Sequence, residues 1–136
     1  MDLATSMIVA ASGMRAQSSR MRTIAENIAN ANSTSQTPGG EPYRRKVATI
    51  KSDFDRDLGA TLVDSGKPVA DTSDFRQQYD PGNPAADKKG YVKLPNVNSL
   101  VEIMDMREAQ RSYEADLDVM SATKSMLSRT IQLLQK

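Results

Sequence analysis

The stretch that decides the fold is residues 98–136, NSLVEIMDMREAQRSYEADLDVMSATKSMLSRTIQLLQK. Pro95 lies just before it, and neither Pro nor Gly interrupts it. Ser99 and Glu102 have the spacing of a capping box, which predicts that a helix begins at Ser99. An apolar side chain then recurs every seven residues, so we expect one long amphipathic helix. The stripe consists of Met106, Tyr113, Met120, Leu127 and Leu134, flanked by Ile103, Leu117 and Ile131.

A second sevenfold stripe lies in residues 1–32, and it predicts another amphipathic helix. The rest of that helix surface is small or polar, which lets another helix approach closely. Two such stripes predict an antiparallel, coiled-coil-like helical hairpin. The stripes can also meet other chains, and the thin Met-rich core favours this second interpretation because Met-rich surfaces repack against several partners. The stripe contains Met7, Met14, Met21 and Ile28, with Leu3 and Ile24 beside it.

The middle of the chain, residues 33–97, differs in composition from both ends. It holds all six prolines and six of the seven glycines, whereas all eight methionines lie outside it. Short candidate strands at 43–50, 69–72, 75–79 and 91–94 are separated by turn residues. We therefore predict a mainly α protein in three segments, 1–32, 33–97 and 98–136, whose middle segment is a small, irregular, partly β insert.

Composition excludes most enzyme mechanisms. The 136 residues include no Cys and no His, so disulfides, thiolate nucleophiles, imidazole bases and the commonest zinc ligands are all missing. The formal net charge of +1 provides no general attraction to nucleic acid or anionic membranes. No run of about 20 apolar residues could span a bilayer, and the first residues do not resemble a cleaved signal peptide. We expect a protein that binds or builds, without cofactor or metal.

Two kinds of charged cluster were considered as sites. Asp53, Asp55 and Asp57 alternate like metal ligands, but the glycine and distal acid of a calcium loop are missing, so a solvated charged run is the better interpretation. The basic clusters at 44–46 and 88–89 have little aromatic interleaving, which disfavours nucleic-acid binding. Three classes therefore remain: a subunit of a helical assembly, a helical adaptor or chaperone, and a carboxylate-only hydrolase that only the presence of acids supports.

The residues at both ends of the chain resemble a known family. SGMRA at 12–16 and IAENIANAN at 24–32 resemble the N-terminal signature of the bacterial flagellar axial proteins, which include the rod and hook proteins. NVN at 96–98 and the run from Glu102 to Ala115 resemble the paired C-terminal signature, although Asp116 stands where Asn is usual. The middle segment resembles the proximal rod members of this family, through TPGG at 37–40, PYRRK at 42–46, YDP at 79–81, NPAAD at 83–87 and GYV at 90–92. The matching positions at the ends and in the middle are Asn27, Asn30, Asn32, Pro38, Tyr43, Pro81, Asp87, Tyr91, Pro95, Asn96, Asn98 and Glu114.

The resemblance implies a structural subunit of the proximal rod of the flagellar basal body, or else another proximal rod protein or an export-associated helical adaptor. It implies a periplasm-spanning location, reached through the flagellar type III export apparatus without signal cleavage, and no cofactor. The implied partners are other copies of the chain, the rod proteins FlgB, FlgF and FlgG, and the adaptor FliE. We expect the two apolar stripes and their flanking residues, listed above, to pack between subunits.

Overall fold

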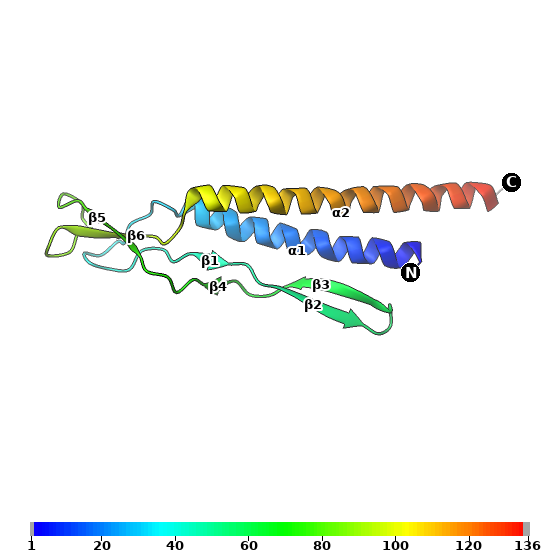
Figure 1. Cartoon of the computed structure of the whole chain (residues 1–136), viewed down its shortest axis with the longest axis horizontal. Helices are drawn as coiled ribbons and strands as arrows, with labels where there is room; N and C mark the ends of the chain where they lie inside the picture. Colours follow the sequence, from blue (N-terminus) through cyan, green and yellow to red (C-terminus); the bar gives the residue numbers. More distant parts are fainter. Residues whose placement is uncertain (1, 135–136) are drawn as a thin grey trace. The chain divides into compact units, whose positions relative to one another are not determined.

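The computed structural model describes residues 2–134, and helices form the larger part of its regular structure (Figure 1). Helix α1 spans Leu3–Ala29 and helix α2 spans Ser99–Leu134, as the two stripes predicted. Between them lie six short strands in three two-stranded antiparallel sheets. The strands are β1 (Lys46–Val47), β2 (Ile50–Asp55), β3 (Ala60–Ser65), β4 (Val69–Ala70), β5 (Arg76–Tyr79) and β6 (Tyr91–Leu94).

The start of α2 differs from the predicted capping box. Helix α2 begins at Ser99, but the cap is Asn98, whose Oδ1 accepts the N–H of Leu100 at 3.1 Å and whose backbone oxygen accepts the N–H of Glu102 at 3.0 Å. The Glu102 carboxylate does not return to the helix end and is buried among other partners. The predicted helix start at Ser99 is confirmed, whereas the predicted capping box was wrong, because Asn is as good a cap as Ser and because Glu102 finds buried donors.

The chain divides into two compact units, each built from parts of all three sequence segments. Unit 1 contains Met1–Met21, Thr49–Lys67 and Arg107–Lys136. Unit 2 contains Arg22–Ala48 and Pro68–Met106.

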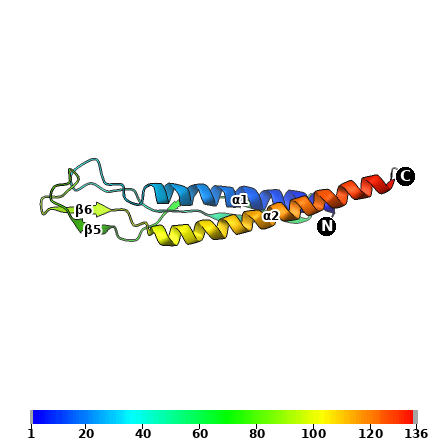
Figure 2. The same ribbon diagram turned by 90° about the horizontal axis from the view of Figure 1, so that it is seen from above.

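In unit 1 the two helical segments run antiparallel (Figure 2). The Asp116 carboxylate lies against Gly13, and further along α1 the Arg20 guanidinium pairs with Glu108 at 3.3 Å. Residue numbers therefore increase along α1 in the direction in which they decrease along α2. The most buried side chains of these segments are small, with Ala16 and Ala109 nearly inaccessible to solvent. Small side chains at these buried positions agree with the small or polar surface that the composition of α1 indicated.

Unit 1 also holds a hairpin that the sequence analysis only partly predicted. Strands β2 and β3 pair from Ile50↔Ser65 to Asp55↔Ala60. Gly59 adopts a positive φ of 59° in the turn, and the Asp55 carboxylate accepts the N–H groups of Asp57 and Leu58. The Asp53–Asp57 run is thus the end of a strand and its turn, although Asp53 and Asp57 are exposed as expected. Strand β3 was not predicted because its extended conformation depends on pairing with β2, which lies outside its own sequence pattern.

Unit 2 contains the other two sheets, β1–β4 and β5–β6, whose four strands lie at the four predicted strand positions. Tyr79 and Tyr91 face each other across β5 and β6 with ring centroids 5.3 Å apart in an edge-to-face arrangement. Gly90 has a φ of 84°, and a Cβ there would lie 2.9 Å from the Tyr79 ring, so this turn requires glycine. Val92 and Val97 form a small buried core nearby.

Candidate assembly surface and a buried polar hub

Asn27 and Glu102 form the centre of a buried polar cluster in unit 2. The side chain of Asn27 donates from Nδ2 to Glu102 Oε2 at 3.0 Å and to the Lys46 backbone oxygen at 2.8 Å. Its Oδ1 accepts the Lys46 N–H at 2.9 Å. The exposed fractions of Asn27 and Glu102 are 1% and 0%. A carboxylate is almost never buried to this degree unless it is paired, so Glu102 requires a cation beside it.

Arg45 is that cation. Its Nε lies 2.6 Å from Glu102 Oε1, and its terminal nitrogens lie 3.4 Å from Asp71 Oδ2 and 3.8 Å from Asp105 Oδ2. The Arg45 backbone N–H donates to Asn96 Oδ1 at 2.8 Å. We name the set Asn27, Tyr43, Arg45, Asp71, Asn96 and Glu102 the polar hub.

Tyr43 completes the polar hub from the side of the insert. Its hydroxyl donates to Asn27 Oδ1 at 2.9 Å. Burial, together with the negative charges of Glu26 and Glu102, raises the pKa of Tyr43 to about 12. Hydrogen bonds from the backbone and side chain of Ser73, together with the Arg45 charge, hold the pKa of Asp71 below its usual range. The cluster thus keeps Tyr43 neutral and Asp71 ionised near neutral pH.

The family-motif residues have several different places in the structure. Three of them lie in the polar hub, namely Asn27, Tyr43 and Asn96. Asn98 caps α2. The Asp87 carboxylate accepts the N–H groups of Lys89 and Tyr91 in the β5–β6 turn. Asn30 donates to the Glu26 backbone oxygen at the end of α1, and Pro95 is buried. Asn32, Pro38, Pro81 and Glu114 are exposed.

Sequence reasoning missed the part that Glu102, Arg45 and Asp71 play together. Sequence reasoning placed Glu102 in a helix cap and Arg45 in a basic cluster. In the structure the two side chains form an ion pair. A signal was present: Glu102 stands seven residues before Ala109, and Ala109 is fully buried in the helix face. An acid at such a position requires a buried partner.

The predicted subunit-packing residues are covered to different degrees within the chain. In α1 only Ile24 is buried, whereas the others are half-buried. Met14 and Tyr113 line one shallow groove in unit 1, together with Ala11, Arg15 and Ser18. In α2, Met106, Tyr113 and Met120 are half-buried, and the exposed ones are Ile103, Leu117, Leu127, Ile131 and Leu134.

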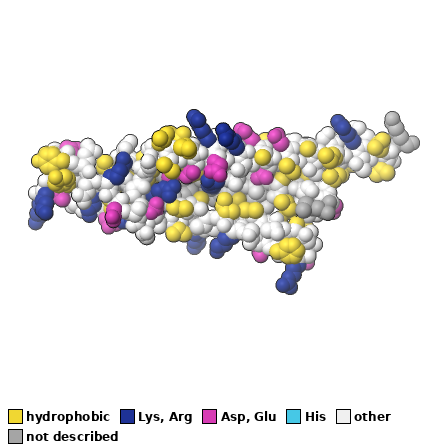
Figure 3. All heavy atoms as spheres, viewed as in Figure 1, with side chains coloured by type: hydrophobic (Ala, Val, Ile, Leu, Met, Phe, Trp, Pro, Cys, Tyr) yellow, Lys and Arg dark blue, Asp and Glu magenta, His cyan; other side chains and the backbone are white. Residues whose placement is uncertain are grey.

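The last part of α2 is open to solvent over its whole circumference. After Thr123, every described residue up to Leu134 is exposed, and we call residues 124–134 the α2 end segment. Five large apolar side chains in it are between 42% and 82% exposed, and hydrophobic side chains gather there on the surface (Figure 3). They are Met126, Leu127, Ile131, Leu133 and Leu134. An exposed apolar patch of this kind marks an interaction surface.

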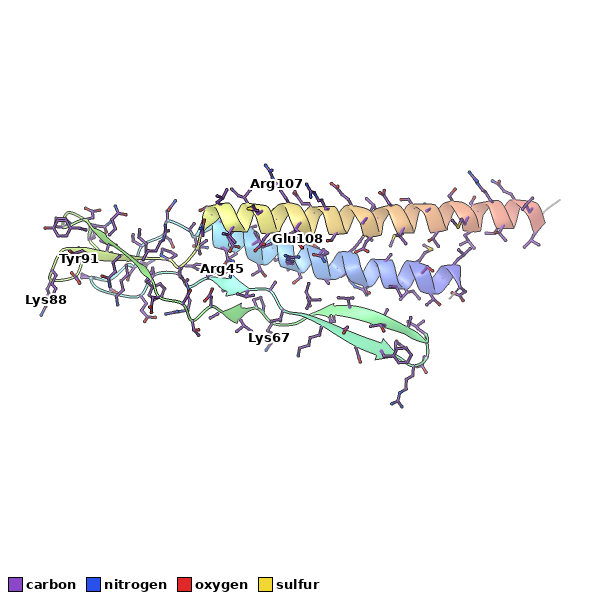
Figure 4. The ribbon with its side chains drawn as sticks, viewed as in Figure 1. Arg45, Lys67, Lys88, Tyr91, Arg107 and Glu108 are labelled. Atoms are coloured by element: carbon purple, nitrogen blue, oxygen red, sulfur yellow. The ribbon has the colours of Figure 1, made fainter. Side chains whose placement is uncertain are left out.

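Two charged residues of α2 in unit 1 lie on different sides of the helix. Arg107 projects from α2 on the side away from α1, while Glu108 points toward α1 (Figure 4).

Within residues 2–134, no three acidic side chains gather where they could hold a metal ion. Neither helix, as far as the structure describes it, is long and apolar enough to cross a membrane.

Comparison with known proteins identifies the family of the chain. Residues 7–35 match the family described as "Flagella basal body rod protein", and residues 88–133 match "Flagellar basal body rod FlgEFG protein C-terminal". The flagellar basal-body rod protein FlgC of Agrobacterium fabrum is 52% identical, over 93% of this chain and 91% of its own length. The FlgC proteins of Borreliella burgdorferi and Bacillus subtilis are 40% and 38% identical, over 99% and 94% of this chain and 99% and 95% of their own lengths.

Two terminal helices with exposed apolar side chains, joined by a small β insert, together with these matches, define a flagellar axial protein of the basal body. Within that class, the chain belongs to the FlgC family of flagellar basal-body rod proteins. It is a structural subunit of the rod, as the resemblance predicted.

Proposed function

We propose that this chain builds the proximal part of the rod by packing its terminal helices against those of neighbouring subunits. The observation that carries the proposal is the α2 end segment, where five large apolar side chains lie exposed and every described residue is open to solvent. Such a surface is unfavourable in water and is stabilised when another helix covers it.

The energies are large enough for this role. At roughly 25 cal/mol per Å² of apolar surface, each well-buried Met or Leu contributes about 2 kcal/mol. Several such side chains together can offset the entropy lost when a subunit docks. The half-buried stripe residues, such as Met14 and Tyr113, would then complete a coiled-coil-like packing once neighbours cover them.

Open-ended growth requires two different surfaces on each subunit, because a heterologous contact that does not close generates a filament. The α2 end segment would be one of these surfaces. Family membership supports contacts with other copies of the chain, with FlgB, FlgF and FlgG, and with the adaptor FliE. It also supports export through the flagellar type III apparatus to a periplasm-spanning rod, and a role without catalysis.

The test substitutes residues that are exposed in the single chain, because such substitutions can impair assembly without impairing folding. Leu127→Asp and Ile131→Asp place a carboxylate in the α2 end segment, and Ser128→Asp provides a control on the same turn. We expect the two apolar-to-Asp variants to fold with normal helical content but to leave cells non-motile and without a complete rod in electron micrographs of basal bodies. Normal swimming with either variant would contradict the proposal.

A further inference from the structure

A sevenfold apolar stripe does not define its own register. When one such stripe slides by seven residues along another, Met meets Met, Tyr or Leu as before, and the packing energy changes little. In unit 1 the most buried side chains of the two helices are small, such as Ala16 and Ala109, and the stripe residues beside them, such as Met14, are only half-buried. Small side chains and half-buried stripes therefore discriminate little between registers that differ by seven residues. The register in which Gly13 meets Asp116 therefore needs another determinant.

The polar hub has the properties of such a determinant. Asn27 uses both of its amide hydrogens, on Lys46 O and Glu102 Oε2, and its oxygen accepts from Tyr43 and from the Lys46 N–H. Both Glu102 oxygens have donors. The set is complete only when α1, residues 43–46 and α2 meet in one arrangement, because a slip of seven residues would bury Asn27 and Glu102 without these partners.

Stability alone does not explain why these residues are polar. Replacing a buried ion pair by apolar residues of similar volume is often neutral or stabilising, whereas a single buried polar residue in a helical seam can specify register at a cost in stability. Apolar side chains would fill the same space with less desolvation.

We propose that Glu102, held by Asn27 and Arg45, is the residue that specifies the register of α1 against α2. Resting on the proposed function, this inference assigns to Glu102 the choice of which apolar side chains face neighbouring subunits. A slip of seven residues would change which part of α2 extends as the exposed end segment. Glu102 is thus a positioning residue for assembly, although it contacts no neighbour itself.

The absence of native cysteine allows a direct test on the purified full chain. Gly13→Cys with Asp116→Cys reports the native register, because the Asp116 Cγ lies 3.0 Å from the position of a Cβ on residue 13. Gly13→Cys with Ala109→Cys, or with Thr123→Cys, reports slips of seven residues. Each pair is combined with wild-type Glu102, with Glu102→Gln and with Glu102→Met. Disulfide yield in dilute solution is then measured by gel mobility.

The wild type should cross-link the native pair at least about tenfold more than either slipped pair, the preference that one buried hydrogen bond provides. Glu102→Gln keeps the side-chain shape but only one of the two acceptors, so it should keep part of this preference. Glu102→Met should retain helical circular dichroism and lose most of this preference. Exclusive native cross-linking in Glu102→Met would overturn the proposal. So would slipped cross-links in Glu102→Gln that are as frequent as those in Glu102→Met, or loss of helix in Glu102→Met, which would make the hub a source of stability.

This experiment measures the register of α1 against α2 within one chain, whereas the Leu127→Asp and Ile131→Asp variants test assembly of the rod. Failure of the register proposal would leave the rod proposal intact. Conversely, normal swimming of the Asp variants would contradict the rod surface without altering the cross-linking result.

Discussion

Asp116 lies so close to Gly13 that a side chain on residue 13 would meet its carboxylate, with Asp116 Cγ only 3.0 Å from the position of the missing Cβ. Gly in the middle of a helix costs about 1 kcal/mol relative to Ala. The close approach of Asp116 explains why α1 accepts this cost in the SGMRA motif. The relationship also connects a residue of the N-terminal signature with one that departs from the family pattern.

Gly13→Ala should stabilise the protein once the Asp116 carboxylate no longer occupies the space of the added methyl group. In an Asp116→Ala background, Gly13→Ala should raise the free energy of unfolding by about 0.5–1 kcal/mol, because helix propensity improves and nothing is displaced. With Asp116 present the gain should be smaller, because the carboxylate must move. A double-mutant cycle by urea denaturation measures the coupling, and equal effects in both backgrounds would show that the contact has no energetic role.

The β2–β3 hairpin should loosen when Ser12 loses its hydroxyl. Ser12 is buried, and its Oγ accepts the Val63 N–H at 3.2 Å while donating to the Val9 oxygen at 2.7 Å. Ser12→Ala leaves the Val63 N–H unsatisfied, which costs about 1–3 kcal/mol. Hydrogen exchange should become faster at the Val63 amide. Exposed Ser18 provides the control as Ser18→Ala, and unchanged Val63 exchange in the Ser12 variant would contradict the prediction.

Stability should fall at high pH because of Tyr43. Its pKa is about 12 in the folded chain against 10.0 for an unperturbed tyrosine. Since the folded pKa is raised, the stabilisation is fully present below about pH 10 and is lost as the pH rises toward about 12. The difference between wild type and Tyr43→Phe in absorbance titration at alkaline pH isolates this group. A midpoint near 10 for Tyr43 would show that the hub does not shield it.

The half-buried stripes should tolerate no charge. Met14→Asp and Met120→Asp each place a carboxylate where assembly would bury it without a partner, at a cost of several kcal/mol. We expect non-motile cells without a distal rod, in which the subunit is still synthesised. Ser121→Asp, exposed beside Met120, should swim.

An export assay distinguishes two explanations for such a defect. Secretion of the Met14→Asp and Met120→Asp subunits with failed assembly would support packing as the role of the stripes. Loss of secretion for Met14→Asp alone would mean that the export apparatus also reads the N-terminal segment. Wild-type swimming of either variant would refute burial of these methionines in the rod.

The two helices were predictable from sequence because their information is local. Seven-residue spacing from Met106 to Leu134, and the absence of Pro and Gly after Pro95, are properties of consecutive residues. Strands β5 and β6 were predictable for a similar reason, since turn residues bound them. Strand β2 was less visible because IKSDFD is mostly polar, and only pairing with β3 makes it a strand.

The sequence by itself determined that this is a mainly helical, Cys- and His-free protein with two apolar stripes around a turn-rich insert. Tertiary structure alone decided that Glu102 is a buried partner of Asn27 and Arg45 instead of a helix cap, and that residues 124–134 remain uncovered. The physical reason is that helix periodicity depends on neighbours three and four residues away, whereas the burial of a carboxylate depends on donors that lie 75 and 57 residues away in the chain.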